Sequence, residues 1–281
     1  MNNHAFRIVN VFARDGRLTG NPLCVFEDGN GIDDATMQAL ARQFNLSETT
    51  FVLPSTKATA RVRIFTPAYE LPFAGHPTLG TAHVVRAMGR GGDSLTLEMQ
   101  AGIIPVSARG DRWTLQAAAP RARAFEMMRG ELEEILGLRP GDVGEYPLWV
   151  STGREQLIVP LTSREAVRRA RPAADAFARL KSADGASMAY VFHDGGDAAG
   201  TVESRFFFPN GAAIVEDPAT GSACANLGGW FTVIRPQADV KRVVSQGEAV
   251  QRPSTLHLDV QGGAIRVGGD VIELARGTLS L

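Results

Sequence analysis

The spacing of apolar and polar positions changes along the chain, and each change predicts a different element. Residues 6–12 alternate between apolar and polar side chains, and residues 23–26 form a second apolar run, so a strand is predicted on each side of a turn. Apolar side chains then recur at helical spacing over residues 37–44. Asp33 or Asp34 can cap this helix, because a carboxylate accepts hydrogen bonds from unpaired N–H groups of the first turn.

Strands and helices continue in an irregular order, which argues against regular βαβ winding. Two predicted helices, over residues 77–88 and within residues 215–234, carry small or apolar side chains almost all round and should be buried on most sides. Other helices are predicted over residues 129–136, 163–169 and 173–181. Strands are predicted around residue 149 and over residues 49–53, 60–65, 95–99, 103–106, 113–116, 157–159, 187–193, 202–208, 255–260, 264–267 and 271–274.

A short pattern occurs twice in the chain. Arg-Ile-Phe-Thr-Pro at residues 63–67 recurs as Arg-Phe-Phe-Phe-Pro at residues 205–209. Each copy leads through a loop to a glycine and a polar residue that open a small-residue helix, Gly75-His76 and Gly221-Ser222. Five letters alone prove little, but the shared order of strand, proline, loop and helix favours a duplicated unit.

The length of 281 residues fits one large domain or two modest ones. With the repeat, we expect an N-terminal domain over residues 1–118 and a C-terminal domain over residues 119–281, with terminal strands that can cross over. If the duplication is a pseudo-twofold, the two helix starts would meet at a cleft between the domains.

Charge and composition exclude several classes of partner. Lys plus Arg number 29 against 30 Asp plus Glu, a formal charge of −1, so no positive field favours nucleic acid or an anionic membrane. No apolar run approaches the roughly 18 residues that span a bilayer, and the first residues do not form a signal sequence. We therefore expect a cytoplasmic protein with no nucleic-acid or membrane partner.

Metal and cofactor signals are equally weak. Cys24 and Cys224 are too few and too far apart for a disulfide framework or a zinc site. The histidines have no metal-binding spacing, and neither a dinucleotide-binding fingerprint nor a Walker sequence is present. The sequence thus predicts neither a metal nor a cofactor.

Two stretches could bind an anion. Residues 74–80 and 216–222 each place a glycine, Gly75 or Gly221, at a helix start, where unpaired N–H groups and the positive end of the helix dipole favour a carboxylate. Such glycines can also serve only a tight turn. His76 follows Gly75, and Asp217 and Ser222 lie on either side of Gly221 in the sequence. These polar side chains favour a binding site.

Glu48 is the candidate general acid and base. Phe44, Leu46, Phe51 and Val52 flank it, and partial burial raises the pKa of a carboxyl group toward the range useful for proton transfer. From the local sequence alone, a surface carboxylate or a turn cap is the simpler interpretation.

A hydrolytic triad is the weakest alternative. Ser222, His76 and Asp217 supply its residue types, but no Gly-x-Ser-x-Gly elbow surrounds the serine. A protein that binds a small carboxylate without catalysis remains a further alternative, although it would not need this set of proton-transfer groups.

Four segments together resemble the phenazine-biosynthesis PhzF-like family. They occur in the family's order and spread over nearly the whole chain: Gly20-Asn-Pro-Leu-Cys-Val-Phe26, Asn45-Leu-Ser-Glu-Thr-Thr-Phe51, Pro72-Phe-Ala-Gly-His-Pro-Thr-Leu-Gly80 and Glu216-Asp-Pro-Ala-Thr-Gly-Ser-Ala-Cys224. The resemblance implies an α+β, diaminopimelate-epimerase-like fold with two pseudo-symmetric domains, each a mostly antiparallel sheet curled around a central helix. It also implies a homodimer.

The same resemblance implies a cofactor-independent isomerase that moves a proton on a small carboxylate-bearing substrate. It maps the family's catalytic glutamate onto Glu48 and assigns His76, Asp217 and Ser222 to holding the substrate or relaying a proton. Backbone groups near Gly75 and Gly221 would bind the carboxylate. Related racemases use a pair of cysteines at the two helix starts, and neither Cys24 nor Cys224 is placed to form such a pair.

Overall fold

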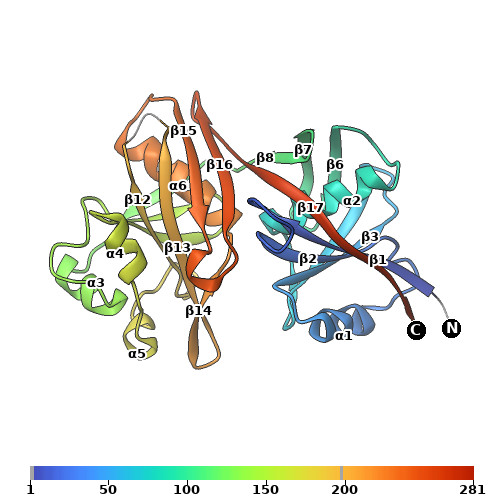
Figure 1. Ribbon diagram of the computed structural model, residues 1–281, viewed down its shortest axis with the longest axis horizontal. Coiled ribbons are helices and arrows are strands. Elements are labelled where there is room, and N and C mark those ends of the chain that lie inside the picture. Colours follow the sequence, from blue (N-terminus) through green and yellow to red (C-terminus); the bar gives the residue numbers. More distant parts are fainter. Residues whose placement is uncertain (1–2, 197–198) are drawn as a thin grey trace. The chain divides into compact units, whose positions relative to one another are not determined.

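The computed structural model describes residues 3–196 and 199–281, which form two compact units (Figure 1). Unit 1 is Met1–Gln116 with Gly268–Leu281, and unit 2 is Ala117–Val267. The predicted division placed residues 119–281 in the second domain but allowed terminal strands to cross over, and residues 268–281 do so. They lie in unit 1 because strand β17 (Ala264–Ser280) leaves unit 2 and pairs antiparallel with β1 (Asn3–Val11).

Unit 1 is a sheet of mixed direction with two helices. β1 pairs antiparallel with β2, β2 runs parallel to β3, and β4 pairs with β3 and β5 antiparallel and with β6 parallel. β7 then pairs antiparallel with β6 and β8. The further bounds are β2 (Asn21–Phe26), β3 (Glu48–Leu53), β4 (Ala60–Phe65), β5 (Glu70–Leu71), β6 (Ser94–Met99), β7 (Gly102–Arg109), β8 (Arg112–Gln116), α1 (Asp34–Phe44) and α2 (Gly75–Ala87).

The two helices of unit 1 differ in burial. The predicted cap of α1 is present, since the Asp33 side chain accepts a hydrogen bond from the Thr36 N–H, and α1 buries one stripe. α2 is buried on most sides and contacts β1, β2, β3 and β8, as its small, apolar composition predicts. A Cβ on Gly80 would lie 2.6 Å from Leu23 Cδ2, so only glycine allows this close approach of helix and sheet.

Unit 2 repeats the order of pairings seen in unit 1. β10 pairs antiparallel with β11, β11 runs parallel to β12, and β13 pairs with β12 and β14 antiparallel and with β15 parallel. β15 then pairs antiparallel with β16. The bounds are β9 (Arg121–Ala124), β10 (Leu148–Ser151), β11 (Glu155–Pro160), β12 (Ala189–Asp194), β13 (Thr201–Asn210), β14 (Ala213–Asp217), β15 (Val240–Gln246) and β16 (Ser254–Gln261).

Helix α6 (Gly221–Ile234) occupies in unit 2 the place that α2 occupies in unit 1, after the short strand β14 as α2 follows β5. It is buried along most of its length and contacts β10, β11 and β16. Three short helices pack together at one side of unit 2 in Figure 1 and bury a separate apolar core: α3 (Arg129–Leu136), α4 (Arg164–Arg169) and α5 (Ala174–Phe177).

Several predicted elements differ from the structure. The strands predicted over residues 264–267 and 271–274 are one strand, β17, because Gly268 lies so close to Thr114 and the Trp113 carbonyl that the ladder continues through the glycine. Strands β5, β9, β14 and β15 were not predicted, and α5 is shorter than expected. Within the described residues, no helix is both long enough and apolar enough to cross a membrane.

Candidate active site

Glu48 and His76 lie together in unit 1. Glu48 is the first residue of β3 and lies three residues after the left-handed Asn45 (φ 51°) that ends α1, and His76 lies in the first turn of α2. His76 Nε2 is 3.4 Å from Glu48 Oε2, and the side chains are only 8% and 15% exposed. The tertiary structure therefore brings into contact two candidate residues that the sequence identified only separately.

The imidazole of His76 is neutral near neutral pH. Burial lowers its pKa from 6.5 to about 3, against a smaller opposing effect of a hydrogen bond to the backbone of Pro22. Proline has no N–H, so this bond runs from the ring to the Pro22 carbonyl oxygen. Since Nε2 has no hydrogen-bond partner among the described residues, the donor is Nδ1, and Nε2 presents a lone pair toward Glu48.

The starts of α2 and α6 have no side-chain caps. Neither helix has a side-chain hydrogen bond at its N-cap or an acidic residue in its first turn, whereas α1 and α4 are capped by Asp33 and Ser163. The first N–H groups of α2 and α6, beginning at Gly75 and Gly221, are thus not used by capping side chains.

Asp217 lies at the end of β14 in a loop that is fixed by buried hydrogen bonds. Thr220 Oγ1 donates to Asp217 Oδ2 over 2.5 Å. Gln246 accepts from the Thr220 N–H (3.3 Å) and donates to Thr220 Oγ1 (3.0 Å) and the Asp217 carbonyl (2.8 Å). Gln246 is fully buried, so the loop that leads into α6 has a defined conformation.

Ser222 is the second residue of α6, and Gln156 of β11 donates a hydrogen bond to its Oγ over 3.0 Å. Asn226, one turn further along α6, in turn donates to Gln156 Oε1 over 2.8 Å. The partner of Ser222 is therefore an amide donor and not a base that could activate a nucleophilic serine.

An arginine–glutamate ion pair precedes each helix start, partly buried in unit 1 and more fully buried in unit 2. In unit 1, Arg63 and Glu70 are 2.7 Å apart and the arginine lies over the Phe65 ring at 5.0 Å. In unit 2, Arg205 and Glu216 are 2.6 Å apart and the arginine lies over the Phe207 ring at 4.7 Å. The repeated pattern in the sequence aligns the two arginines, whereas their glutamate partners were not predicted.

An alignment of the two repeated segments without gaps could have revealed these glutamates. Glu-Leu-Pro-Phe-Ala-Gly at residues 70–75 matches Glu-Asp-Pro-Ala-Thr-Gly at residues 216–221, with glutamate, proline and glycine shared. The alignment places His76 at the position of Ser222 and Leu71 at the position of Asp217. The two units therefore present different polar groups on the same local framework.

Both cysteines are buried, each within its own unit. Cys24 and Cys224 are free and fully buried, and burial raises the pKa of each thiol, so neither is a ready thiolate. Across the described part of the chain, no three His, Cys, Asp or Glu residues are grouped as metal ligands.

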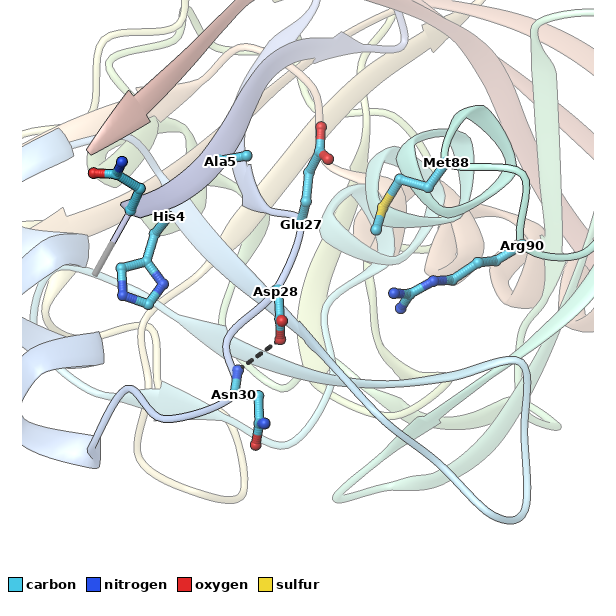
Figure 2. Close-up of a pocket in the computed structure, with 8 residues that line it drawn as sticks. His4, Ala5, Glu27, Asp28, Asn30, Met88 and Arg90 are labelled. Carbon is cyan, nitrogen blue, oxygen red and sulfur yellow. Dashed lines mark hydrogen bonds between the residues drawn. The ribbon is translucent and has the colours of Figure 1, made fainter. Parts of the chain in front are cut away.

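Two surface hollows lie away from the residues described so far. The hollow in Figure 2, about 570 Å³, is lined in unit 1 by His4, Glu27 and Asp28 on one side and by Met88 and Arg90 on the other. A second hollow, about 320 Å³, is lined in unit 2 by residues that include Tyr146, Trp230 and His193. Neither lining includes a predicted site residue.

The family model described as phenazine biosynthesis-like protein, PhzC-PhzF, matches residues 9–276. The chain belongs to this family. An uncharacterized isomerase of Pasteurella multocida is 36% identical over 98% of this chain and 94% of its own length. A trans-2,3-dihydro-3-hydroxyanthranilate isomerase of Pseudomonas aeruginosa is 35% identical over 94% of this chain and 93% of its own length. The PhzC-PhzF relatives show that the chain is an isomerase.

Solved structures agree with this assignment. A PhzF family protein of Bacillus anthracis matches with a TM-score of 0.90 at 25% identity, over 100% of both chains. A hydroxyproline epimerase of Agrobacterium vitis matches with a TM-score of 0.62 at 12% identity, over 99% of this chain and 93% of that chain. This second likeness shows that the PhzC-PhzF fold of this chain is shared with epimerases of that type.

Proposed function

We propose that this isomerase moves a proton on a small, carboxylate-bearing substrate without a cofactor, with Glu48 as the general acid and base. The buried contact of Glu48 with a neutral histidine carries the proposal. The relatives' activity makes trans-2,3-dihydro-3-hydroxyanthranilate the first substrate to test.

The proposed reaction has two proton transfers through one carboxyl group. Glu48 as the carboxylate takes a proton from an activated carbon, and the resulting acid returns it elsewhere on the conjugated system. His76 Nε2 lies 3.4 Å from Glu48 Oε2 and carries a lone pair. It is therefore suited to accept a hydrogen bond from the protonated Glu48 and so to orient it. No metal or redox step is needed, because the substrate gains and loses only a proton.

In this proposal, residues near the two uncapped helix starts hold the substrate. The N–H groups near Gly75 and Gly221 bind its carboxylate, Ser222 donates a further hydrogen bond, and Asp217 interacts with charge that develops during the reaction. The fixed loop from Asp217 to Thr220 supports such a role, since preorganised groups need not reorganise when charge develops.

We also propose that the fold is diaminopimelate-epimerase-like, with two pseudo-symmetric domains. The repeated order of strand pairings supports it, as does the recurrence of an Arg–Glu pair beside a phenylalanine in each unit.

Glu48→Gln tests the function. Positioned acid–base catalysis contributes about 10²- to 10⁴-fold, so kcat for trans-2,3-dihydro-3-hydroxyanthranilate should fall by at least about 100-fold while the melting temperature stays near wild type. Glu98→Gln is the matched control and should keep the wild-type rate, because Glu98 of β6 accepts its hydrogen bond from the Ser55 hydroxyl and is not among the proposed site residues.

Deuterium incorporation from D₂O into the product is the second readout. A full rate in Glu48→Gln would remove Glu48 from the mechanism. Binding with no proton exchange in the wild type would favour a non-catalytic binder, and a covalent adduct of Ser222 with a serine-reactive probe would favour the hydrolase alternative.

A further inference from the structure

A chain of buried side-chain amides leads to Ser222 inside unit 2. Asn226 is fully buried and Gln156 is 2% exposed. Asn226 Oδ1 accepts from the Thr152 N–H (2.7 Å) and the Thr152 hydroxyl (2.8 Å), and its amide nitrogen donates to the Arg154 carbonyl (2.9 Å). The chain continues through Gln156 to Ser222.

The direction of each bond is fixed from one end. A backbone N–H can only donate, so the Asn226 atom that faces the Thr152 N–H is the amide oxygen. The Asn226 nitrogen therefore faces Gln156, which must present its oxygen there. Gln156 then has only its nitrogen left for Ser222, so the Ser222 hydroxyl oxygen is an acceptor in this bond.

The Ser222 hydroxyl consequently keeps its proton for another partner. Ser222 is only partly buried, and the described residues offer this proton no acceptor of their own. A carboxylate oxygen is a strong acceptor for such a donor, because charge-assisted hydrogen bonds are the stronger ones.

We propose that Gln156 and Asn226 are positioning residues that fix the Ser222 hydroxyl as a donor to the substrate carboxylate. This inference rests on the proposed function, since it takes a carboxylate-bearing substrate as given. It assigns a task to two buried residues of β11 and α6 that the reaction itself does not touch.

Unit 1 shows that the fold does not require this polar chain. The strand registers place Leu23 at the position of Gln156, and counting along α2 and α6 from their first residues places Gly80 at the position of Asn226. Leu23 and Gly80 pack in direct apolar contact. Since buried amides are costly unless they are fully hydrogen-bonded, their retention in unit 2 points to a function at Ser222.

Side-chain amide NMR tests the direction of the chain without a substrate. Both NH₂ groups are buried and donate hydrogen bonds, so their protons should exchange slowly with solvent. Ser222→Ala removes the acceptor of Gln156 and should accelerate exchange at Gln156 while Asn226 stays protected. An unchanged Gln156 resonance in this variant would overturn the assigned direction.

Calorimetric titration tests the function of the donor. The probes are 3-hydroxyanthranilate, a planar acid with the substituents of the relatives' substrate, and its carboxamide. Ser222→Ala should raise the Kd of the acid about tenfold or more, and that of the carboxamide less, because a hydrogen bond to a charged group is lost. Equal losses for both probes, or no binding of the acid to the wild type, would overturn the inference.

Gln156→Glu tests the positioning role. Its carboxylate would accept from Asn226 and from the Ser222 hydroxyl, which would then no longer donate to the ligand. The added charge also repels the acid. The same substitution is therefore made in the Ser222→Ala variant, where repulsion is the only effect left. We expect Gln156→Glu to weaken binding of the acid several-fold more when Ser222 is present than when it is alanine. In kinetic measurements of the variant with Ser222, KM should change more than kcat. Gln156→Leu, which copies Leu23, is the uncharged control and should give an intermediate loss.

The two proposals can fail separately. Suppose that Gln156→Glu weakens ligand binding more with Ser222 present than in the Ser222→Ala background, and that Glu48→Gln keeps full activity. This outcome would refute the proposed function and leave the inference standing. An inactive Glu48→Gln with equal losses in both Gln156→Glu backgrounds would refute the inference and leave the function standing.

Discussion

At the scale of single residues, burial decides what His76 can do. A solvent-exposed histidine has a pKa of 6.5, whereas burial in the first turn of α2 lowers the pKa of His76 to about 3. The 3.4 Å contact with Glu48 is therefore, near neutral pH, a contact with a neutral ring and not an ion pair. This protonation state supports the proposal that Glu48 is the general acid and base.

The lowered pKa of His76 predicts a pH dependence of stability. Between pH 6.5 and about 3 the unfolded chain binds one proton more than the folded chain, so the free energy of unfolding falls as the pH drops through this range. The slope from this group reaches about 1.4 kcal/mol per pH unit. Urea unfolding of the wild type and His76→Gln at several pH values should show a shallower decline in the variant. Parallel declines would contradict the neutral state.

At the scale of elements, the central helices differ from the surface helices in what they tolerate. α2 packs so closely on β1 and β2 that a Cβ on Gly80 would lie 2.6 Å from Leu23 and 2.8 Å from Val11. By contrast, Gly130 of α3 is an exposed helical glycine with no atom within 4 Å of a built Cβ. The same substitution should therefore have opposite effects at the two positions.

Gly80→Ala should lower the free energy of unfolding by about 1–3 kcal/mol, because overpacking forces neighbouring side chains to shift. Gly130→Ala should raise it by about 0.5–1 kcal/mol, because alanine loses less conformational entropy in a helix. Denaturant unfolding of both variants checks the pair. A neutral Gly80→Ala would mean that α2 can move away from the sheet.

At the scale of the whole molecule, strand β17 links the two units through the backbone. It begins at Ala264 in unit 2, but from Gly268 onward it belongs to unit 1, where Val271–Ser280 pair with β1. Sequence neighbours near the C-terminus thus contribute to the stability of different units. Val260 of β16 and Val271 of β17 are each 1% exposed and serve as a matched pair across this division.

Val271→Asp should destabilise unit 1, and Val260→Asp unit 2, by several kcal/mol, because each buries an unpaired charge. Amide hydrogen exchange resolved by peptide should show faster exchange in α2 for Val271→Asp and in α6 for Val260→Asp. Equal acceleration in both helices for either variant would mean that the units unfold as one.

Much of the local structure could be predicted from spacing alone. The stripe that forms α1, its Asp33 cap and the all-round small residues of α2 and α6 are local patterns, and they lead directly to the observed elements. Strands β5, β9 and β14 were missed because they are short, and β15 because polar residues interrupt its apolar positions; each is defined by its pairing with another strand.

Ordered motifs along the chain were enough to identify the family, the repeat and Glu48, His76, Asp217 and Ser222 as candidates. The three-dimensional structure was needed to show that Glu48 contacts a neutral His76, that Gln246 holds the Asp217 loop, and that Gln156 donates a hydrogen bond to Ser222. Protonation states and hydrogen-bond directions depend on burial and on partners far apart in the chain, and spacing along a sequence does not contain either.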